Sequence, residues 1–155
     1  MNWPTINKVQ TIVFDFDGVF TDNGVSLSED GKESIRCSRY DGFGITFLQK
    51  FIKKTNLTTK LMVLSKEPNP VVLGRTKKLK LECAHGVDDK LTFLKKYFTE
   101  NNMEDGFSTL VYLGNDLNDL SVMRKANFSV APSDAHPVIQ KCASVVLPEK
   151  GGHGF

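Results

Sequence analysis

A short apolar run that ends directly in closely spaced acids constrains this chain more than any other stretch. Residues 12–14 read Ile-Val-Phe, and residues 15–22 follow at once as DFDGVFTD. A β-branched and aromatic run bounded by glycine is typical of a buried strand, so we predict a strand over residues 9–14. Asp15 and Asp17 then lie at its carboxyl end, on the same side of the strand. In open α/β sheets, ligands bind at this edge.

Two carboxylates this close repel each other unless a cation or a proton lies between them. The simpler alternative is a turn rich in Asp and Gly, because turns favour both residue types. If the other strands also end in polar or charged side chains at this edge of the sheet, a binding site is favoured over a turn.

Composition limits the classes of protein to consider. The 155 residues, with 40% hydrophobic and 25% charged residues, suit one globular domain over residues 1–155. The net charge of +2 gives no reason to expect a nucleic-acid partner. No apolar run approaches the ~20 residues of a membrane span, so no membrane partner is expected.

The cysteines and the N-terminus indicate the compartment. Cys37, Cys83 and Cys142 are scattered and form no CxxC pair, which argues against a zinc site or a disulfide framework. The first residues, MNWP, lack the basic and apolar regions of a signal peptide. We therefore expect a cytoplasmic protein with reduced thiols.

Strand and helix patterns alternate along the rest of the chain. Further apolar strand patterns occupy residues 60–64, 82–85, 110–113, 128–131 and 145–147, with helical patterns between them. This alternation predicts parallel pairing with helices on both faces of the sheet. The expected fold is α/β, a Rossmann-like doubly wound parallel sheet without a large cap domain.

A β-hairpin is expected directly after the acidic stretch. Two alternating segments, residues 25–28 and 34–37, flank a turn that contains Asp30-Gly31. Asp-Gly between such segments is a strong hairpin signal, so we place an inserted hairpin at about residues 23–38. Two strands alone are only marginally stable in water, so this hairpin should pack on its own chain or on another subunit.

Helix ends and helix faces are also predicted. Asp41 is expected to cap the next helix. Its apolar face would consist of Phe47, Leu48, Phe51 and Ile52, opposite a face that carries lysines. Pro70 suits the first turn of a second helix, and Asp88 or Asp89 is expected to cap a third.

Polar side chains follow several of the predicted strands. Besides Asp15 and Asp17, these positions hold Ser65, Lys66, Lys90, Asn115, Asp116 and Asp119. Parallel strands bring such positions to one edge of the sheet. Hard oxygen ligands with few histidines suit Mg²⁺. A metal cation with a lysine is what a transferring phosphoryl group needs, because its charge spreads over its equatorial oxygens.

These motifs resemble the haloacid dehalogenase (HAD) superfamily of phosphatases. DFDGVFTD is similar to its first motif, and Ser65, Lys90 and the GNDLND of residues 114–119 follow in the same order, each after a predicted strand. The hairpin, DGFGI at residues 41–45, AHP at residues 135–137 and the glycine-rich tail resemble a narrower group. That group is the capless, tetrameric sugar-acid phosphatases, which act on 3-deoxy-octulosonate 8-phosphate or on nonulosonate (sialic-acid-type) 9-phosphates. Nonulosonate phosphatases also occur fused to acylneuraminate cytidylyltransferases.

The resemblance implies a role for each motif residue. Asp15 would be the nucleophile that forms an aspartyl-phosphate, and Asp17 would protonate the leaving oxygen and then activate water. Lys90 would neutralise charge on Asp15 and on the phosphate. Phosphate or substrate would be bound by Ser65, Lys66 and Gly18. Mg²⁺ would be held by Asp15, Asp17 and Asn115, with Asp116 and Asp119 as further candidates.

The chain departs from the group's pattern at two places. Asn115 stands where aspartate is common, so one ligand contributes no charge. Ser65-Lys66-Glu67 replaces the Thr-Gly-Arg common in octulosonate phosphatases, and Lys66 could face the substrate carboxylate. Both departures favour a nonulosonate 9-phosphate over octulosonate 8-phosphate.

Two other functions are alternatives to the phosphatase. A degenerate, non-catalytic module could hold together an assembly beside a sialic-acid-type cytidylyltransferase, and Asn115 favours this. A phosphoryl-transfer mutase is disfavoured, because no insertion is long enough for a cap domain. For the phosphatase, the resemblance implies a homotetramer in which a neighbour helps to shape each site.

Overall fold

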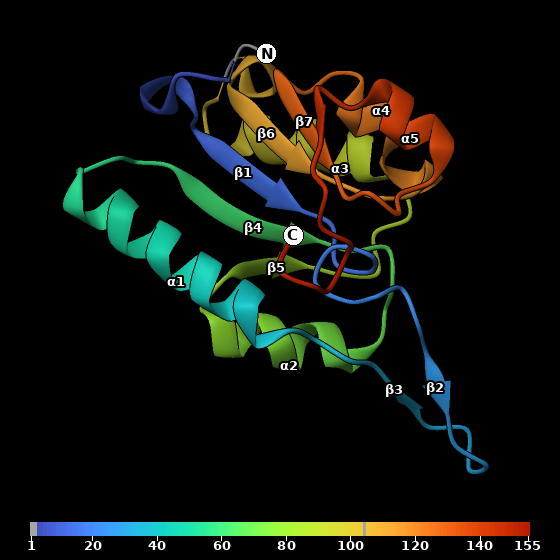
Figure 1. Ribbon diagram of the computed structural model, residues 1–155. Helices are drawn as coiled ribbons and strands as arrows, with labels where there is room; N and C mark the ends of the chain where they lie inside the picture. Colours follow the sequence, from blue (N-terminus) through green and yellow to red (C-terminus); the bar gives the residue numbers. More distant parts are fainter. Residues whose placement is uncertain (1–2, 104) are drawn as a thin grey trace.

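Six parallel strands form the sheet that the alternation of patterns predicts, which confirms the expected fold class (Figure 1). In the computed structural model, which describes residues 3–103 and 105–155, the strand order is β5-β4-β1-β6-β7-β8. The strands are β1 (Thr11–Phe14), β4 (Lys60–Leu64), β5 (Glu82–Ala84), β6 (Leu110–Leu113), β7 (Phe128–Ala131) and β8 (Val145–Val146). Met1 and Asn2, from the segment examined for a signal peptide, and Glu104 lie outside the described residues.

The central strand β1 pairs with β4 on one side and with β6 on the other. It is shorter than the strand expected over residues 9–14, because a 3-10 turn at Ile6–Lys8 leads into it. Its carboxyl end, and with it Asp15, therefore lies in the middle of the sheet.

Helices cover the sheet from both faces (Figure 1). On one face lie α1 (Arg39–Lys54) and α2 (Pro70–Leu79); on the other lie α3 (Lys90–Glu100), α4 (Leu120–Met123) and α5 (Pro137–Cys142). Alternate residues of β1 divide between the two cores. Val13 packs with the side of α3, α4 and α5, whereas Ile12 and Phe14 pack with the side of α1 and α2.

The helix caps agree with the sequence except at α1. Asn69 caps α2 just before Pro70, and Asp89 rather than Asp88 caps α3. The expectation that Asp41 caps the first helix is wrong, because that helix begins earlier and Ser38 accepts the N–H of Tyr40. Asp41 instead lies buried in the first turn.

The expected apolar face of α1 is also partly wrong. Leu48 and Ile52 are half-buried, but residues Phe47 and Phe51 are 66% and 45% exposed. The helix thus has apolar residues on an outer side as well as on the side that faces the sheet.

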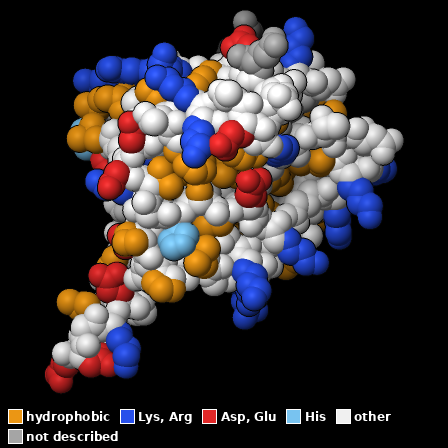
Figure 2. Space-filling view, turned by 180° about the vertical axis from the view of Figure 1, so that it is seen from behind, with side chains coloured by type: hydrophobic (Ala, Val, Ile, Leu, Met, Phe, Trp, Pro, Cys, Tyr) orange, Lys and Arg blue, Asp and Glu red, His pale blue; other side chains and the backbone are white. Residues whose placement is uncertain are grey.

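The hairpin is present but short. Its strands are β2 (Ser26–Leu27) and β3 (Glu33–Ser34), which pair antiparallel and are exposed. The hairpin projects from the body, with charged side chains at its tip (Figures 1 and 2). Asn69 Nδ2 donates to Glu33 Oε2 of β3 at 2.9 Å, and Ile35 and Cys37, just after β3, pack against the core on the side of α1 and α2.

Within residues 3–103 and 105–155, none of the helices has the length and apolar character that crossing a bilayer requires.

Candidate active site

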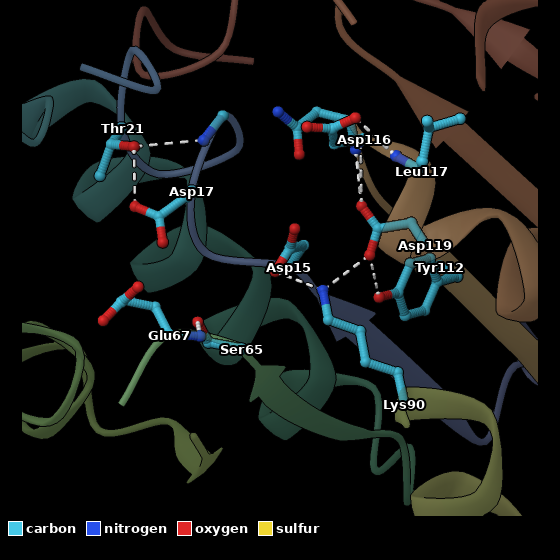
Figure 3. A network of polar contacts seen from close by, with 12 residues as sticks. Asp15, Asp17, Thr21, Ser65, Glu67, Lys90, Tyr112, Asp116, Leu117 and Asp119 are labelled. Atoms are coloured by element: carbon cyan, nitrogen blue, oxygen red, sulfur yellow. Dashed lines mark hydrogen bonds and ion pairs between the residues drawn. The ribbon is translucent and has the colours of Figure 1, made fainter. Parts of the chain in front are cut away.

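The buried ammonium group of Lys90 lies between two buried carboxylates at the carboxyl edge of the sheet (Figure 3). Its Nζ is 2.6 Å from Asp15 Oδ1 and 2.7 Å from Asp119 Oδ1. Asp15 follows β1 directly, Lys90 is the first residue of α3, and Asp119 lies after β6, so the fold brings the three together. All three side chains are at most 5% exposed.

The titration of these groups reflects their shared burial. Burial and then the charge of Asp119 raise the pKa of Asp15 to about 8, although Lys90 lowers it. Burial by itself lowers the pKa of Lys90, but the two carboxylates outweigh this and raise it. When Asp15 is ionised, the two carboxylates and the one ammonium carry a net negative charge in a buried place, so a further cation bound there would stabilise the ionised form of Asp15.

Both carboxylate oxygens of Asp119 accept hydrogen bonds. Oδ1 accepts from Lys90 Nζ and, at 2.6 Å, from the hydroxyl of Tyr112; Oδ2 accepts the N–H groups of Asn115 and Asp116. Such a fully used carboxylate is suited to fixing the lysine and the loop after β6. As a metal ligand it would first have to give up one of these contacts.

Asp17 lies on the loop after β1, two residues beyond Asp15, and its side chain points away from Lys90 (Figure 3). Its Oδ1 accepts from the hydroxyl of Thr21 at 3.3 Å. Burial raises the pKa of Asp17, Thr21 lowers it, and the charge of Glu67 raises it further. A carboxyl group with a raised pKa can donate a proton near neutral pH.

The loop after β6 presents an acceptor that lacks a donor. Asn115 is buried, and within the described residues its Oδ1 has no hydrogen-bond partner. Its amide lies against Gly18, where a Cβ would come within 1.7 Å of Asn115 Nδ2. A buried amide oxygen without a donor suits a cation, since such an oxygen otherwise carries a desolvation cost.

The donor set fits a hard divalent cation. The candidates are the Asp15 carboxylate, the Asp17 backbone carbonyl and Asn115 Oδ1, all oxygens, next to a net negative charge. Among residues 3–103 and 105–155, no three His, Cys, Asp or Glu side chains gather as a metal cluster. A metal here would therefore depend on a carbonyl and an amide oxygen as well as a carboxylate. Asp116 caps the turn that follows and accepts the N–H of Leu117.

A pocket of about 510 Å³ opens over these groups. It is lined by Asp15, Asp17, Ser65, Lys66, Glu67, Pro68, Gly86, Asp88 and Asn118. Ser65 follows β4 and is buried, with its Oγ accepting the N–H of Glu67 at 3.1 Å. The exposed Lys66 ammonium lies 3.7 Å from Asp88 Oδ1. The sequence-predicted residues Asp15, Asp17, Ser65 and Lys66 thus share one pocket.

Three interactions of the site were not predicted from the sequence. Tyr112 reads as a strand residue, yet its buried hydroxyl supports Asp119. In the sequence, Glu67 appears only in the Ser65-Lys66-Glu67 segment that departs from the group's pattern, yet its charge raises the pKa of Asp17. The tail at Gly151 and Gly152 shows no periodicity, yet it packs so tightly on the loop after β1 that a Cβ on Gly151 would lie 2.1 Å from the carbonyl oxygen of Gly18. Only the third left a signal, its run of glycines.

Known proteins resemble this chain in sequence and in fold. No protein-family model matches the sequence. The curated 3-deoxy-D-manno-octulosonate 8-phosphate phosphatase KdsC of Salmonella typhi is 29% identical over 161 residues, which cover 95% of this chain and 74% of that protein. A solved HAD family hydrolase from Streptomyces avermitilis MA-4680 is 36% identical with a TM-score of 0.88, covering 99% of this chain and 83% of that one.

A further solved structure extends the likeness in fold. The 3-deoxy-D-manno-octulosonate 8-phosphate phosphatase of Moraxella catarrhalis, in complex with magnesium, phosphate and KDO, is 24% identical with a TM-score of 0.85. The match covers 96% of this chain and 82% of that one. The fold is therefore shared over nearly the whole described chain.

Proposed function

Because the chain belongs to the HAD family of hydrolases and is a HAD-type phosphatase, we propose that it hydrolyses a sugar-acid phosphate with Mg²⁺ as cofactor. The observation that carries the proposal is the buried Asp15–Lys90–Asp119 group beneath a pocket that also holds Asp17 and Ser65. A purely structural role would not require a buried ammonium between two carboxylates at the ligand-binding edge of the sheet.

In the proposed mechanism the first step transfers the phosphoryl group to Asp15. A carboxylate oxygen of Asp15 attacks phosphorus while the bond from phosphorus to the sugar oxygen breaks. Asp17 gives its proton to that leaving oxygen, for which its raised pKa is suited. Lys90 offsets the negative charge on Asp15, and the Ser65 hydroxyl donates to a phosphoryl oxygen.

In the second step water releases phosphate from the aspartyl-phosphate. Asp17, now ionised, takes a proton from the water that attacks phosphorus, and the bond to Asp15 breaks. Asp15, the Asp17 carbonyl and Asn115 would hold Mg²⁺, which would supply positive charge for the phosphoryl oxygens. Gly18 leaves room for Asn115, and Asp119 fixes Lys90 in place.

The identity of the sugar is the finer part of the proposal. The name of the KdsC relative supports 3-deoxy-octulosonate 8-phosphate. Ser65-Lys66-Glu67 and Asn115 support a nonulosonate 9-phosphate instead. Lys66, exposed at the pocket, is available for the carboxylate that both substrates carry.

A substrate panel tests the proposal. Phosphate release is measured for octulosonate 8-phosphate, nonulosonate 9-phosphate, simple hexose phosphates and p-nitrophenyl phosphate, each with Mg²⁺. We expect the two sugar-acid phosphates to have the highest kcat/KM, with the nonulosonate first. Hexose phosphates at the top would contradict the substrate class. No turnover of any compound at any Mg²⁺ concentration would favour the non-catalytic module, which the uncharged Asn115 supports.

Assembly and compartment complete the proposal. We infer a homotetramer with shared sites, and the exposed Val25 and Leu27 of the hairpin support contact between copies. Cys37, Cys83 and Cys142 are free thiols, which supports the cytoplasm as the compartment.

A further inference from the structure

Tyr112, in β6, directs its hydroxyl at the Asp119 carboxylate (Figure 3). The hydroxyl donates to Asp119 Oδ1 at 2.6 Å, and the same oxygen accepts from Lys90 Nζ at 2.7 Å. Tyr112 is 0% exposed and is not among the residues that line the pocket over Asp15. Any effect of Tyr112 on a bound substrate must therefore pass through Asp119 and Lys90.

Different groups fix the two oxygens of Asp119. Oδ2 accepts the N–H groups of Asn115 at 2.9 Å and of Asp116 at 3.3 Å. In the part of the chain that the structure describes, the donors to Oδ1 are Lys90 and Tyr112. The Lys90 ammonium would gain a new acceptor when a phosphoryl group binds, so the Tyr112 hydroxyl is the contact that then keeps Oδ1 in place.

The position of Asp119 Oδ1 decides where Lys90 can donate. The ammonium group has three N–H donors, of which Asp15 Oδ1 at 2.6 Å and Asp119 Oδ1 at 2.7 Å take two. The third is available for a phosphoryl oxygen, and its direction follows from the first two because the bonds of the ammonium group are tetrahedral. We propose that Tyr112 is a positioning residue for phosphoryl transfer, whose hydroxyl fixes Asp119 Oδ1 and thereby aims Lys90 at the phosphoryl group. This role rests on the proposed function.

The charges at the site support the same role. Without the hydroxyl, Asp119 Oδ1 would accept from Lys90 alone and would draw the ammonium group away from Asp15. Little water reaches these side chains to screen that attraction, since all of them are at most 5% exposed. Burial, followed by the charges of Asp119 and Asp15, raises the pKa of Tyr112 well above its ordinary value, so the hydroxyl keeps its proton and remains a donor.

Tyr97 provides a matched control within the same core. It lies on α3, packs in the same buried cluster as Tyr112 and is 8% exposed. Its hydroxyl also donates to a carboxylate, Glu82 Oε2, at 3.2 Å. Glu82 begins β5 and is not among the residues that line the pocket. Tyr97→Phe and Tyr112→Phe thus each remove a hydroxyl that donates to a carboxylate, but only Tyr112→Phe removes it from the site.

The first experiment measures kcat, KM and the melting temperature of wild type and both variants, with the best sugar-acid phosphate and saturating Mg²⁺. We expect Tyr112→Phe to lower kcat at least tenfold and to change KM less than twofold, because the aim of Lys90 matters most while charge develops on the phosphoryl oxygens. Tyr97→Phe should keep the kcat of wild type. A purely structural role of Tyr112 would lower the melting temperature and leave the kcat of the folded enzyme unchanged.

The outcomes separate the role of Tyr112 from the proposed function. An active wild type with an equally active Tyr112→Phe would overturn the role and leave the phosphatase in place. Equal loss of kcat in Tyr112→Phe and Tyr97→Phe would also overturn it, because the loss would then come from the packing of the core. A wild type that releases phosphate from no sugar-acid phosphate would overturn the proposed function, and the role of Tyr112 with it.

A double-variant cycle tests whether Tyr112 acts through Asp119. Asp119→Ala removes the acceptor of the hydroxyl, so adding Tyr112→Phe to it should change kcat by less than twofold. A further tenfold loss would show that the hydroxyl acts on another group and would overturn the proposal.

Binding of orthovanadate, which mimics the phosphoryl group during transfer, gives a measurement that needs neither turnover nor the Asp119→Ala variant. In calorimetric titrations with Mg²⁺, we expect Tyr112→Phe to bind vanadate at least tenfold more weakly than wild type, and Tyr97→Phe to bind it as tightly. Equal vanadate affinity in Tyr112→Phe and wild type would overturn the positioning role.

Discussion

At the scale of single residues, the site is organised by Asp119 as much as by Asp15. Asp119 accepts four hydrogen bonds and so connects Lys90, Tyr112 and the loop that carries Asn115. Removing either charge of a buried pair leaves the other uncompensated, which typically costs about 3–5 kcal/mol. Substitution of Asp119 should therefore affect both folding and the position of Lys90 and Asn115, for which we propose roles in catalysis and metal binding.

Asn115 offers a test of the metal site that does not require turnover. Asn115→Asp adds a carboxylate beside Asp15, so the variant should melt at a lower temperature in chelator than the wild type. The added charge should also tighten Mg²⁺ binding about tenfold, because affinity rises with ligand charge. Calorimetric titration and melting with and without Mg²⁺ measure both effects.

A matched control is Asn127→Asp, an exposed position away from the pocket. It should change neither the Mg²⁺ affinity nor the gain in melting temperature that Mg²⁺ produces. Equal Mg²⁺ affinity in Asn115→Asp and wild type would remove Asn115 from the proposed ligand set.

At the scale of elements, α1 differs most from its sequence-based description. Asp41 resembles a cap because it precedes an apolar repeat, but Ser38 begins the helix earlier. Within residues 3–103 and 105–155, neither carboxylate oxygen of the buried Asp41 has a hydrogen-bond partner. Burial raises the pKa of Asp41 to about 6, despite the opposing charge of Arg75.

This raised pKa makes stability depend on pH. Because the folded-state pKa of about 6 lies above the unfolded value of 3.8, the folded form binds the proton more tightly. The protonated Asp41 carboxyl therefore contributes its full stabilisation below pH 3.8, the pKa in the unfolded chain. This contribution is lost as the pH rises through about 6, the pKa in the folded protein. We expect Asp41→Asn to be more stable relative to wild type at pH 8 than at pH 4 by about 1–2 kcal/mol.

Urea unfolding across this pH range measures the difference. Glu29→Gln at the exposed hairpin tip is the control and should follow the wild type at every pH. Parallel pH profiles for Asp41→Asn and wild type would show that Asp41 does not titrate in this way.

The hairpin is a second element whose attachment can be tested. Asn69 Oδ1 caps α2, while its Nδ2 donates to Glu33 in β3. Asn69→Asp keeps the cap but loses the donor and sets a second carboxylate beside Glu33. We expect faster tryptic cleavage at Lys32 and Arg36, with global stability changed by less than about 1 kcal/mol.

Glu33→Gln serves as the comparison, because it keeps an acceptor for Asn69 without the charge. Its cleavage rate should stay near that of wild type. If Asn69→Asp is cleaved no faster than wild type, the hairpin is held by other contacts.

At the scale of the whole molecule, the sequence predicted what depends on local pattern. Apolar runs such as residues 60–64 and 128–131 became strands with those bounds, and their alternation with helices set the parallel sheet. In this parallel sheet the carboxyl ends of the strands lie at one edge. Asp15, Asp17, Ser65 and Lys90, which are up to 75 positions apart in the chain, therefore lie close together there.

Contacts across the fold could not be predicted in this way. The support of Asp119 by Tyr112 depends on how β6 and the following turn are placed, and a tyrosine in an apolar strand gives no sign of it. The packing of Gly151 and Gly152 on the loop after β1 joins segments more than 130 residues apart. The exposure of Phe47 and Phe51 also could not be predicted, because a helical repeat of apolar residues does not by itself show which side of the helix faces the core.

The most direct test of the account is phosphate release by wild type and Asp15→Asn, measured on the best sugar-acid phosphate with Mg²⁺ and again with chelator. The asparagine keeps the size of the side chain but is not a nucleophile. We predict release by wild type that stops on chelation, and a loss of at least a thousandfold in kcat for a folded Asp15→Asn. Full activity of Asp15→Asn, or activity that persists in chelator, would contradict the account.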